Sequence, residues 1–231
     1  MNQKQELITL NMQNLSPGEN KLSLPGEVGN IEAILHLPRE NVNNIQSGPI
    51  FICCHPHPLY GGAMSNKVVH TLCRTFSKMG LPSLRFNFRG VGESKGTHDN
   101  GIGESRDLLL LCNIMKQNWP DSPLWLAGFS FGSWVAAHTA KQVGAEQLLS
   151  IAPPVKHFDF DTFDKPDCPW LILMGEEDEI VEPQSVFDWV DSQKSPPTLI
   201  KFAETGHFFH RQLVNMGQLL QQHYQNFLSD Q

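Results

Sequence analysis

The sequence lacks long apolar runs and basic tracts. No stretch approaches the roughly 18 consecutive apolar residues that a membrane-spanning helix requires. The polar N-terminus, Met1–Glu6, has no apolar segment typical of a signal peptide. The 17 Lys and Arg residues are outnumbered by 24 Asp and Glu, so the formal net charge is −7. We therefore expect neither a membrane nor a nucleic acid among the partners of this protein.

Cysteine is also scarce, and its number is odd. The five cysteines cannot all pair with one another, and a chain of 231 residues is too long to need disulfides for stability. Four of the five stand in apolar runs: Cys53, Cys54, Cys73 and Cys112. We expect reduced, mostly buried thiols and a cytoplasmic location. Charged residues make up only 18% of the chain and hydrophobic residues 40%, which excludes a disordered or coiled-coil protein.

The pattern of apolar residues changes near residue 49. Residues 1–48 are polar and rich in turns, with Pro17-Gly18 and Pro25-Gly26 beside short alternating runs at 7–10 and 31–37, which predicts antiparallel edge strands and hairpins. In residues 49–231, apolar strands alternate with helical stripes. The predicted strands are 50–54, 84–88, 124–127, 148–152, 170–174 and 199–202, and the predicted helices include 69–76, 108–119, 134–143, 186–190 and 213–227.

This alternation indicates an α/β fold in which a mostly parallel sheet is covered by helices on both faces. No linker or internal repeat divides the chain, so we expect one domain, 1–231. Open sheets of this kind bind ligands beyond the carboxyl ends of their strands. Functional residues are therefore expected just after each strand.

Ser130 lies at the centre of the motif Gly128-Phe-Ser-Phe-Gly132, between a predicted strand and a predicted helix. In a nucleophile elbow, a serine occupies a strained strand-to-helix turn whose flanking residues have no room for a Cβ. A second match to the pattern, centred on Ser94, follows a glycine-rich turn and leads into a loop. We predict that Ser130 is the nucleophile, against the alternative that its turn is only structural.

A nucleophilic serine needs a histidine base and a carboxylate that orients the base. Asp178 follows the strand at 170–174 and His207 follows the strand at 199–202, in the order that this strand-turn-helix arrangement requires. Glu177 is the alternative carboxylate, and His210 is the alternative base. Asp178 is preferred because the apolar residues after it indicate that the chain turns back toward the interior.

The oxyanion that forms during acyl transfer needs two preorganised N–H donors. One is expected from Phe131, which directly follows the nucleophile. The other is expected from the loop after the strand at 50–54. Pro56 and Pro58 have no N–H, which leaves His57 and Leu59.

Two further clusters have structural explanations. His55 and His57 could be metal ligands, but no third ligand stands nearby, and we expect neither a metal nor another cofactor. Cys53-Cys54 could be redox-active, although burial at a strand end explains the pair better. The glycine turn around Arg89 is interpreted as architectural, with Arg89 anchoring loops near the site.

Taken together, these motifs resemble those of small, lidless bacterial α/β-hydrolases grouped near the dienelactone hydrolases. The resemblance runs from about Leu24 to the C-terminus. It rests on His55–Pro58, Gly61-Gly62, Asn66–Val69, Leu84–Gly92, Gly128–Gly132, Ala152–Pro154 and Gly206–Phe209. It implies a Ser–Asp–His triad at Ser130, Asp178 and His207, with oxyanion donors at Phe131 and His57. Dienelactone hydrolases have cysteine where Ser130 stands, which argues against a dienelactone substrate.

We therefore expect a serine hydrolase that cleaves small carboxylic esters through an acyl-enzyme and takes a small-molecule acyl substrate. Thioesterase, acyltransferase or peptidase activity on the same triad is the alternative, as is a non-catalytic ligand-binding member of the fold. Only about fourteen residues separate Pro154 from Cys168, where relatives with a lid insert a helical cap. This short connection predicts an open site. The oligomeric state is not defined by the sequence.

The substrate pocket is predicted from aromatic residues near these loops. The candidates are Tyr60, Phe158, Phe160, Phe163 and Phe208. For the three phenylalanines between residues 155 and 168, packing of the loop on the core is an equally good explanation.

Overall fold

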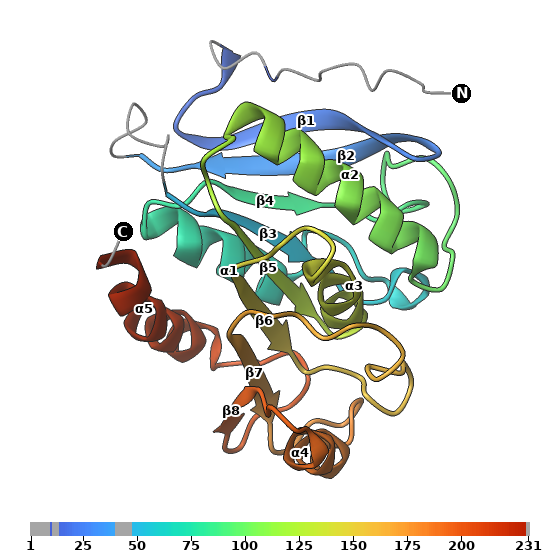
Figure 1. The fold of residues 1–231 in the computed structure, drawn as a ribbon, viewed down its shortest axis with the longest axis vertical. Coiled ribbons are helices and arrows are strands. Elements are labelled where there is room, and N and C mark those ends of the chain that lie inside the picture. Colours follow the sequence, from blue (N-terminus) through green and yellow to red (C-terminus); the bar gives the residue numbers. More distant parts are fainter. Residues whose placement is uncertain (1–9, 11–13, 40–47, 230–231) are drawn as a thin grey trace.

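A computed structural model describes residues 10, 14–39 and 48–229, and its central feature is an eight-stranded sheet in the order β1-β2-β4-β3-β5-β6-β7-β8 (Figure 1). The pairings of β1 with β2 and of β2 with β4 are antiparallel, and the other five pairings are parallel. The strands are β1 (Gly18–Gly26), β2 (Gly29–Leu37), β3 (Ile50–Cys54), β4 (Ser83–Phe86), β5 (Leu124–Phe129), β6 (Gln147–Ile151), β7 (Trp170–Gly175) and β8 (Thr198–Phe202). The predicted mostly parallel sheet is confirmed.

Strands β1 and β2 form an edge hairpin, as the turn signals in the first 48 residues predict. Their register runs from Gly18 opposite Leu37 to Gly26 opposite Gly29. The turn between the two strands is formed by Glu27 and Val28. Residues 7–9 of the alternating run predicted at 7–10 lie outside the described residues.

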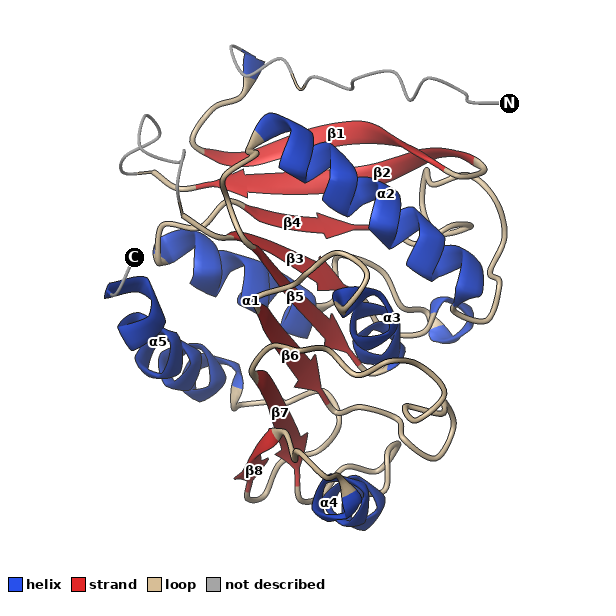
Figure 2. Cartoon of the chain, in the orientation of Figure 1, coloured by secondary structure: helices blue, strands red, loops and turns tan. Residues whose placement is uncertain are grey.

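Five α-helices cover the sheet in the described part of the chain. They are α1 (Lys67–Lys78), α2 (Ile102–Asn118), α3 (Phe131–Ala140), α4 (Pro183–Ser192) and α5 (Leu213–Ser229). Helices α1 and α5 pack together on one face, and α2, α3 and α4 lie on the other (Figure 2). Every residue of β3, β5, β6 and β7 is buried, as expected for strands with helices on both sides.

The six parallel strands place their following segments at one edge of the sheet. The segments that follow β3, β4, β5, β6, β7 and β8 all leave from the carboxyl ends of these strands. The connection between β6 and β7, residues 152–169, contains no helix. This edge therefore carries no helical cap between β6 and β7.

Among the residues that the structure describes, no helix combines the length and apolar character that crossing a bilayer requires.

Candidate active site

Ser130 occupies a strained turn between β5 and α3. Its φ of 54° and ψ of −122° lie where non-glycine residues are rarely found, a feature typical of functional sites. A Cβ at Gly128 would lie 2.0 Å from the Gly132 carbonyl oxygen, and a Cβ at Gly132 would lie 2.5 Å from the Cys54 carbonyl oxygen. Both glycines are therefore required for the serine to reach this conformation.

His207 and Asp178 form a buried hydrogen-bonded pair. Nδ1 of His207 lies 2.7 Å from Oδ2 of Asp178, and the other carboxylate oxygen accepts the backbone N–H groups of Ile180 and Val181 at 2.8 and 2.7 Å. The Asp178 side chain is wholly buried. Because the carboxylate accepts the Nδ1 proton, Nε2 of His207 is left as the basic nitrogen.

The backbone around His207 is also fixed. Its N–H donates to Oε2 of Glu179 at 3.1 Å. A Cβ at Gly175, at the end of β7, would lie 2.2 Å from the Thr205 carbonyl oxygen, so the β7 and β8 loops can approach only because residue 175 is glycine. The His207 ring lies 4.9 Å from that of Phe129, the residue directly before Ser130.

The two alternative residues are not part of this pair. Glu177 is exposed, and its N–H donates to the Thr205 carbonyl oxygen. His210 is exposed as well, and its ring lies 5.8 Å from that of Phe208. The structure therefore brings together Asp178 and His207, and neither Glu177 nor His210.

The two candidate oxyanion donors are neighbours. Phe131 is the first residue of α3, where amide N–H groups have no partner within the helix. Its ring lies 4.9 Å from the ring of His57, in the loop after β3. The N–H of Leu59 donates to Nδ1 of His57 at 3.2 Å, so Leu59 is engaged within its own loop. This geometry favours His57 over Leu59 as the second donor.

His55 has a structural role. The ring is fully buried, Nδ1 donates to the Pro56 carbonyl oxygen at 2.6 Å, and Nε2 accepts the Phe88 N–H at 2.9 Å. Burial lowers the pKa of His55 to about 3, so the ring is neutral. Both ring nitrogens are occupied by protein partners. Within the described part of the chain, no three His, Cys, Asp or Glu side chains converge as a metal site would require.

Three of the predicted pocket residues lie beside these groups. The Phe158 ring is 5.1 Å from that of Phe131. Tyr60 is 87% exposed, with its ring 4.8 Å from that of His57. Phe208 lies against His207, with ring centroids 5.2 Å apart.

The other two predicted pocket residues lie elsewhere. Phe160 is only 1% exposed and packs against Trp170 and Trp189, so the predicted pocket role is wrong for Phe160. The physical reason is that its loop folds back over the start of β7 and over α4, which turns this phenylalanine into the core. Phe163 packs against Trp134 and His138 of α3 rather than against Phe131.

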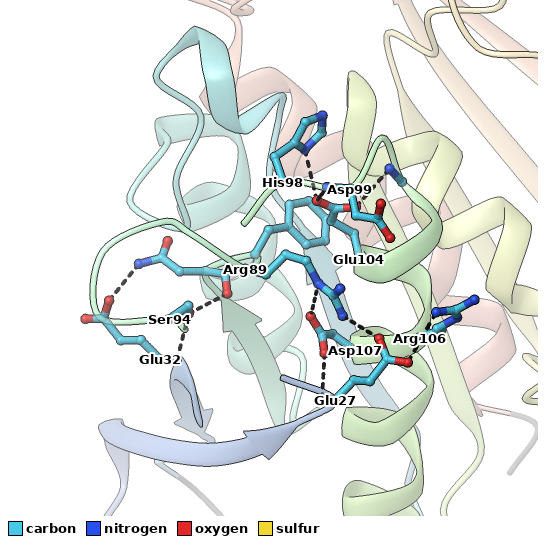
Figure 3. Close-up of polar contacts among 12 residues, drawn as sticks. Glu27, Glu32, Arg89, Ser94, His98, Asp99, Glu104, Arg106 and Asp107 are labelled. Atoms are coloured by element: carbon cyan, nitrogen blue, oxygen red, sulfur yellow. Dashed lines mark hydrogen bonds and ion pairs between the residues drawn. The ribbon is translucent and has the colours of Figure 1, made fainter. Parts of the chain in front are cut away.

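A second histidine–carboxylate pair, His98 and Glu104, was not predicted from the sequence. Nδ1 of His98 lies 2.9 Å from Oε1 of Glu104 (Figure 3). The His98 ring is 4.7 Å from the His57 ring and 5.5 Å from the Phe131 ring. Glu104 stands three residues after the helix cap Gly101, a capping pattern that was visible in the sequence. No sequence signal marked His98.

The segment after β4 is held by polar contacts, as predicted. Ser94, in the second Gly-x-Ser-x-Gly match, donates to the Asn87 carbonyl oxygen at 2.7 Å and accepts the Glu32 N–H at 2.9 Å. Arg89 donates to Asp107 and Glu27 at 2.7 and 3.0 Å (Figure 3). Ser94 is therefore structural, and Arg89 ties this segment to α2 and to the β1–β2 turn.

The cysteines are thiols, and all five are free. Cys53 and Cys54 are fully buried at the end of β3, and burial raises the pKa of both thiols well above the usual range. A thiol held in its protonated form is a poor nucleophile. The strand-end explanation for this pair therefore fits the structure.

Known proteins share this architecture. A family model described as an alpha/beta hydrolase domain matches residues 57–230. A crystal structure of an α/β serine hydrolase without a lid, from Xanthomonas campestris, is 39% identical with a TM-score of 0.86, and the match covers 93% of this chain and 97% of that one. An α/β serine hydrolase homologue from Coxiella burnetii is 38% identical with a TM-score of 0.83, covering 89% and 97%.

Two further matches concern the fold and the family. A dienelactone hydrolase from Anabaena variabilis is 14% identical with a TM-score of 0.69, over 91% of this chain and 99% of that one, which shows a shared fold alone. An uncharacterized protein of Rickettsia prowazekii is 38% identical over 160 residues, 67% of each chain. The chain belongs to the α/β-hydrolase family, and specifically to its serine hydrolases.

Proposed function

We propose that this protein hydrolyses small carboxylic esters through an acyl-enzyme formed on Ser130. The observation that carries the proposal is the His207–Asp178 hydrogen bond of 2.7 Å, in a pair whose imidazole packs on the residue before a strained serine. A histidine with Nδ1 held by a buried carboxylate has the tautomer that a general base for serine requires.

In the proposed acylation step, Nε2 of His207 takes the proton of the Ser130 hydroxyl as Oγ attacks the ester carbonyl carbon. Asp178 keeps Nδ1 protonated and stabilises the imidazolium that forms. The N–H groups of Phe131 and His57 bind the negative oxygen of the tetrahedral intermediate, and each such donor typically contributes about 3 kcal/mol. The intermediate collapses as His207 protonates the departing alcohol oxygen.

Deacylation repeats this chemistry with water. Nε2 of His207 accepts a proton from water as the water oxygen attacks the acyl carbon. The second intermediate then expels Ser130 Oγ, which is reprotonated by His207, and the carboxylic acid leaves. The cycle consumes one water and restores every side chain.

The open edge of the sheet supports small substrates. The β6–β7 connection contains no helix, and Tyr60 beside the candidate oxyanion loop is 87% exposed. A site of this kind has little apolar surface with which to enclose a long lipid chain. We propose Phe158, Tyr60 and Phe208 as its walls. The five free thiols support a reducing, cytoplasmic location.

The proposal is tested by hydrolysis of p-nitrophenyl acetate and by labelling with a fluorophosphonate probe. Ser130→Ala should lower kcat/KM by at least about 10⁴-fold, because the nucleophile is lost. Mass spectrometry should locate the label on Ser130 in the folded wild-type protein. Thioester and amide substrates in the same assay would distinguish esterase from thioesterase or peptidase activity.

Ser94→Ala is the matched control, since Ser94 is the central serine of the other Gly-x-Ser-x-Gly match. The folded Ser94→Ala protein should still carry the label on Ser130. Wild-type turnover in Ser130→Ala, or a folded wild-type protein without label on Ser130, would contradict the proposal. The second result would favour a non-catalytic ligand-binding protein.

A further inference from the structure

The His98–Glu104 pair is built rigidly beside the candidate oxyanion hole. Glu104 is fully buried, and its two oxygens accept the N–H groups of Asp99 at 3.0 Å and Gly101 at 2.8 Å (Figure 3). The His98 side chain is 9% exposed and donates through Nδ1 to the same carboxylate. The imidazole is therefore held at a fixed orientation, while its own loop is otherwise polar and exposed.

The remaining nitrogens of His98 and His57 are chemically complementary. Nδ1 of His98 donates to Glu104, which leaves Nε2 as the acceptor nitrogen of the imidazole. Nδ1 of His57 accepts the Leu59 N–H, so the proton of the neutral ring is on Nε2, which is a donor. Burial lowers the pKa of His57, which keeps that ring neutral at pH 7.

Both Nε2 atoms are available to a ligand. Neither atom has a hydrogen-bond partner among the described residues, and neither is fully buried. The two ring centroids are 4.7 Å apart, and both rings rest on Phe131. One donor and one acceptor side by side match a hydroxyl group, which can accept one hydrogen bond and donate another.

The position of His98 indicates which part of the substrate it faces. His207 must reach the leaving-group oxygen, so the leaving group lies on the side of Ser130 where His207 packs against Phe129. His98 lies on the other flank, against Phe131. The group beside His98 and His57 is therefore on the acyl portion of the ester.

We propose that His98, positioned by Glu104, and His57 form a subsite that hydrogen-bonds a hydroxyl group on the acyl part of the substrate, so that hydroxy-acyl esters are the preferred substrate class. This inference rests on the proposed ester hydrolysis at Ser130. It adds a specificity-determining residue, His98, that takes no part in the proton transfers assigned to His207.

The test compares p-nitrophenyl butyrate with the p-nitrophenyl esters of 2-hydroxybutyrate and 3-hydroxybutyrate, which share leaving group and chain length. In the wild-type protein, kcat/KM should be at least about ten-fold higher for one hydroxy ester, because a site built to bind a hydroxyl leaves polar groups unpaired without it. In His98→Leu, the ratio of hydroxy to plain ester should fall about ten-fold. Glu104→Gln, which keeps His98 but weakens its orientation, should lower the ratio by a smaller factor.

His223→Leu, the same substitution on α5, is the matched control and should leave the ratio unchanged. A wild-type ratio below two for both hydroxy esters, or an unaltered ratio in folded His98→Leu, would overturn the subsite. The p-nitrophenyl hemisuccinate ester is a third arm. If it is the preferred substrate and His98→Leu removes that preference, the subsite binds a carboxylate and the hydroxyl assignment is wrong.

The two proposals fail in different ways. If hydrolysis of p-nitrophenyl butyrate persists in Ser130→Ala, the proposed function fails whatever the ratios are. If hydrolysis depends on Ser130 and the ratio is indifferent to His98, only the subsite fails. Thermal melting of each variant confirms that a changed ratio is measured on folded protein.

Discussion

Two histidine–carboxylate pairs flank Ser130, and they are built in the same way. His207 bonds Asp178 at 2.7 Å and His98 bonds Glu104 at 2.9 Å, each through Nδ1. Each carboxylate also accepts two backbone N–H groups from residues within five positions of it in the chain. The difference lies in what each imidazole touches, since His207 packs on Phe129 and His98 on Phe131, the residues before and after Ser130.

We infer from this comparison that the position of each pair, rather than the hydrogen-bonded pair itself, distinguishes their proposed roles. Asp178 and His207 come from the loops after β7 and β8, at the same edge of the sheet as the turn that carries Ser130. Glu104 lies in the first turn of α2, where a carboxylate satisfies free N–H groups and complements the helix dipole. In our proposal, the Asp178–His207 pair moves protons, and the His98–Glu104 pair closes a helix end while holding an imidazole beside the acyl group.

The sharpest test of this division is to remove each imidazole in turn. His207→Ala should lower kcat/KM for p-nitrophenyl acetate by about 10⁵-fold or more, because the general base is lost. His98→Ala should change it by less than about three-fold, because acetate has no hydroxyl for the proposed subsite to bind. Steady-state kinetics on both variants measures the gap, and equal losses would show that the two pairs share one chemical role.

The second test changes the carboxylates. Asp178→Asn should lower kcat by about 10⁴-fold, because an amide that donates to Nδ1 forces the proton onto Nε2 and removes the base. Ile180 and Val181 still have an oxygen to donate to, so the loop can keep its form. Glu177→Gln, at the exposed neighbour, should change kcat by less than about two-fold. The measurement is kcat as a function of pH for both variants. If Asp178→Asn lowers kcat only slightly across the measured pH range, Asp178 has no part in the proposed mechanism.

The third test concerns the contribution of Glu104 to stability. Glu104→Ala is expected to lower the free energy of unfolding by about 3 kcal/mol, because His98 and two backbone N–H groups lose a buried acceptor at once. Glu93→Ala, at an exposed position in the same segment, should cost less than about 0.5 kcal/mol. Urea unfolding at pH 7 measures both values. If Glu104→Ala is as stable as wild type, the helix-closing role is wrong.

His55 provides a third histidine for comparison, one whose two nitrogens bond only backbone groups. Its folded-state pKa of about 3 lies below the usual value of 6.5, so the unfolded chain binds more protons between these values. Stability is therefore full above about pH 6.5 and is lost as the pH falls. From pH 7 to pH 5 the contribution of His55 to this loss should be about 2 kcal/mol.

The measurement is urea unfolding at both pH values for wild type and His55→Asn. The variant should be less stable at pH 7, since Asn cannot bond both the Pro56 carbonyl and the Phe88 N–H at the same positions. Its stability should depend less on pH than that of the wild type. An equal pH dependence in the two proteins would mean that His55 does not titrate in this way.

Much of the site could be predicted because its requirements are local. The tight turn at Ser130 requires glycine at positions 128 and 132, and the whole motif spans five consecutive residues. Asp178 and His207 were found because each follows an apolar strand in a parallel sheet, which places both at one edge. Strand and helix positions followed from the same periodicities.

The wrong prediction for Phe160 and the omission of His98 have a common cause. Both residues lie in loops, and the path of a loop depends on contacts with residues distant in the sequence. Phe160 and Phe158 stand two residues apart in one loop, yet Phe158 lies beside Phe131 and Phe160 lies against Trp170 and Trp189. No local pattern distinguishes them. Their positions are decided by how residues 152–169 fold back over α4 and the start of β7.

The sequence by itself determined the class of fold, the nucleophile candidate and the order of the residues predicted to act with it, because periodicity and steric demand operate over a few residues. The tertiary structure showed that Asp178, and not the alternative Glu177, meets His207, and it alone placed His98 beside His57. These contacts join segments that are distant in the sequence. They depend on which groups the packed sheet brings within hydrogen-bonding distance.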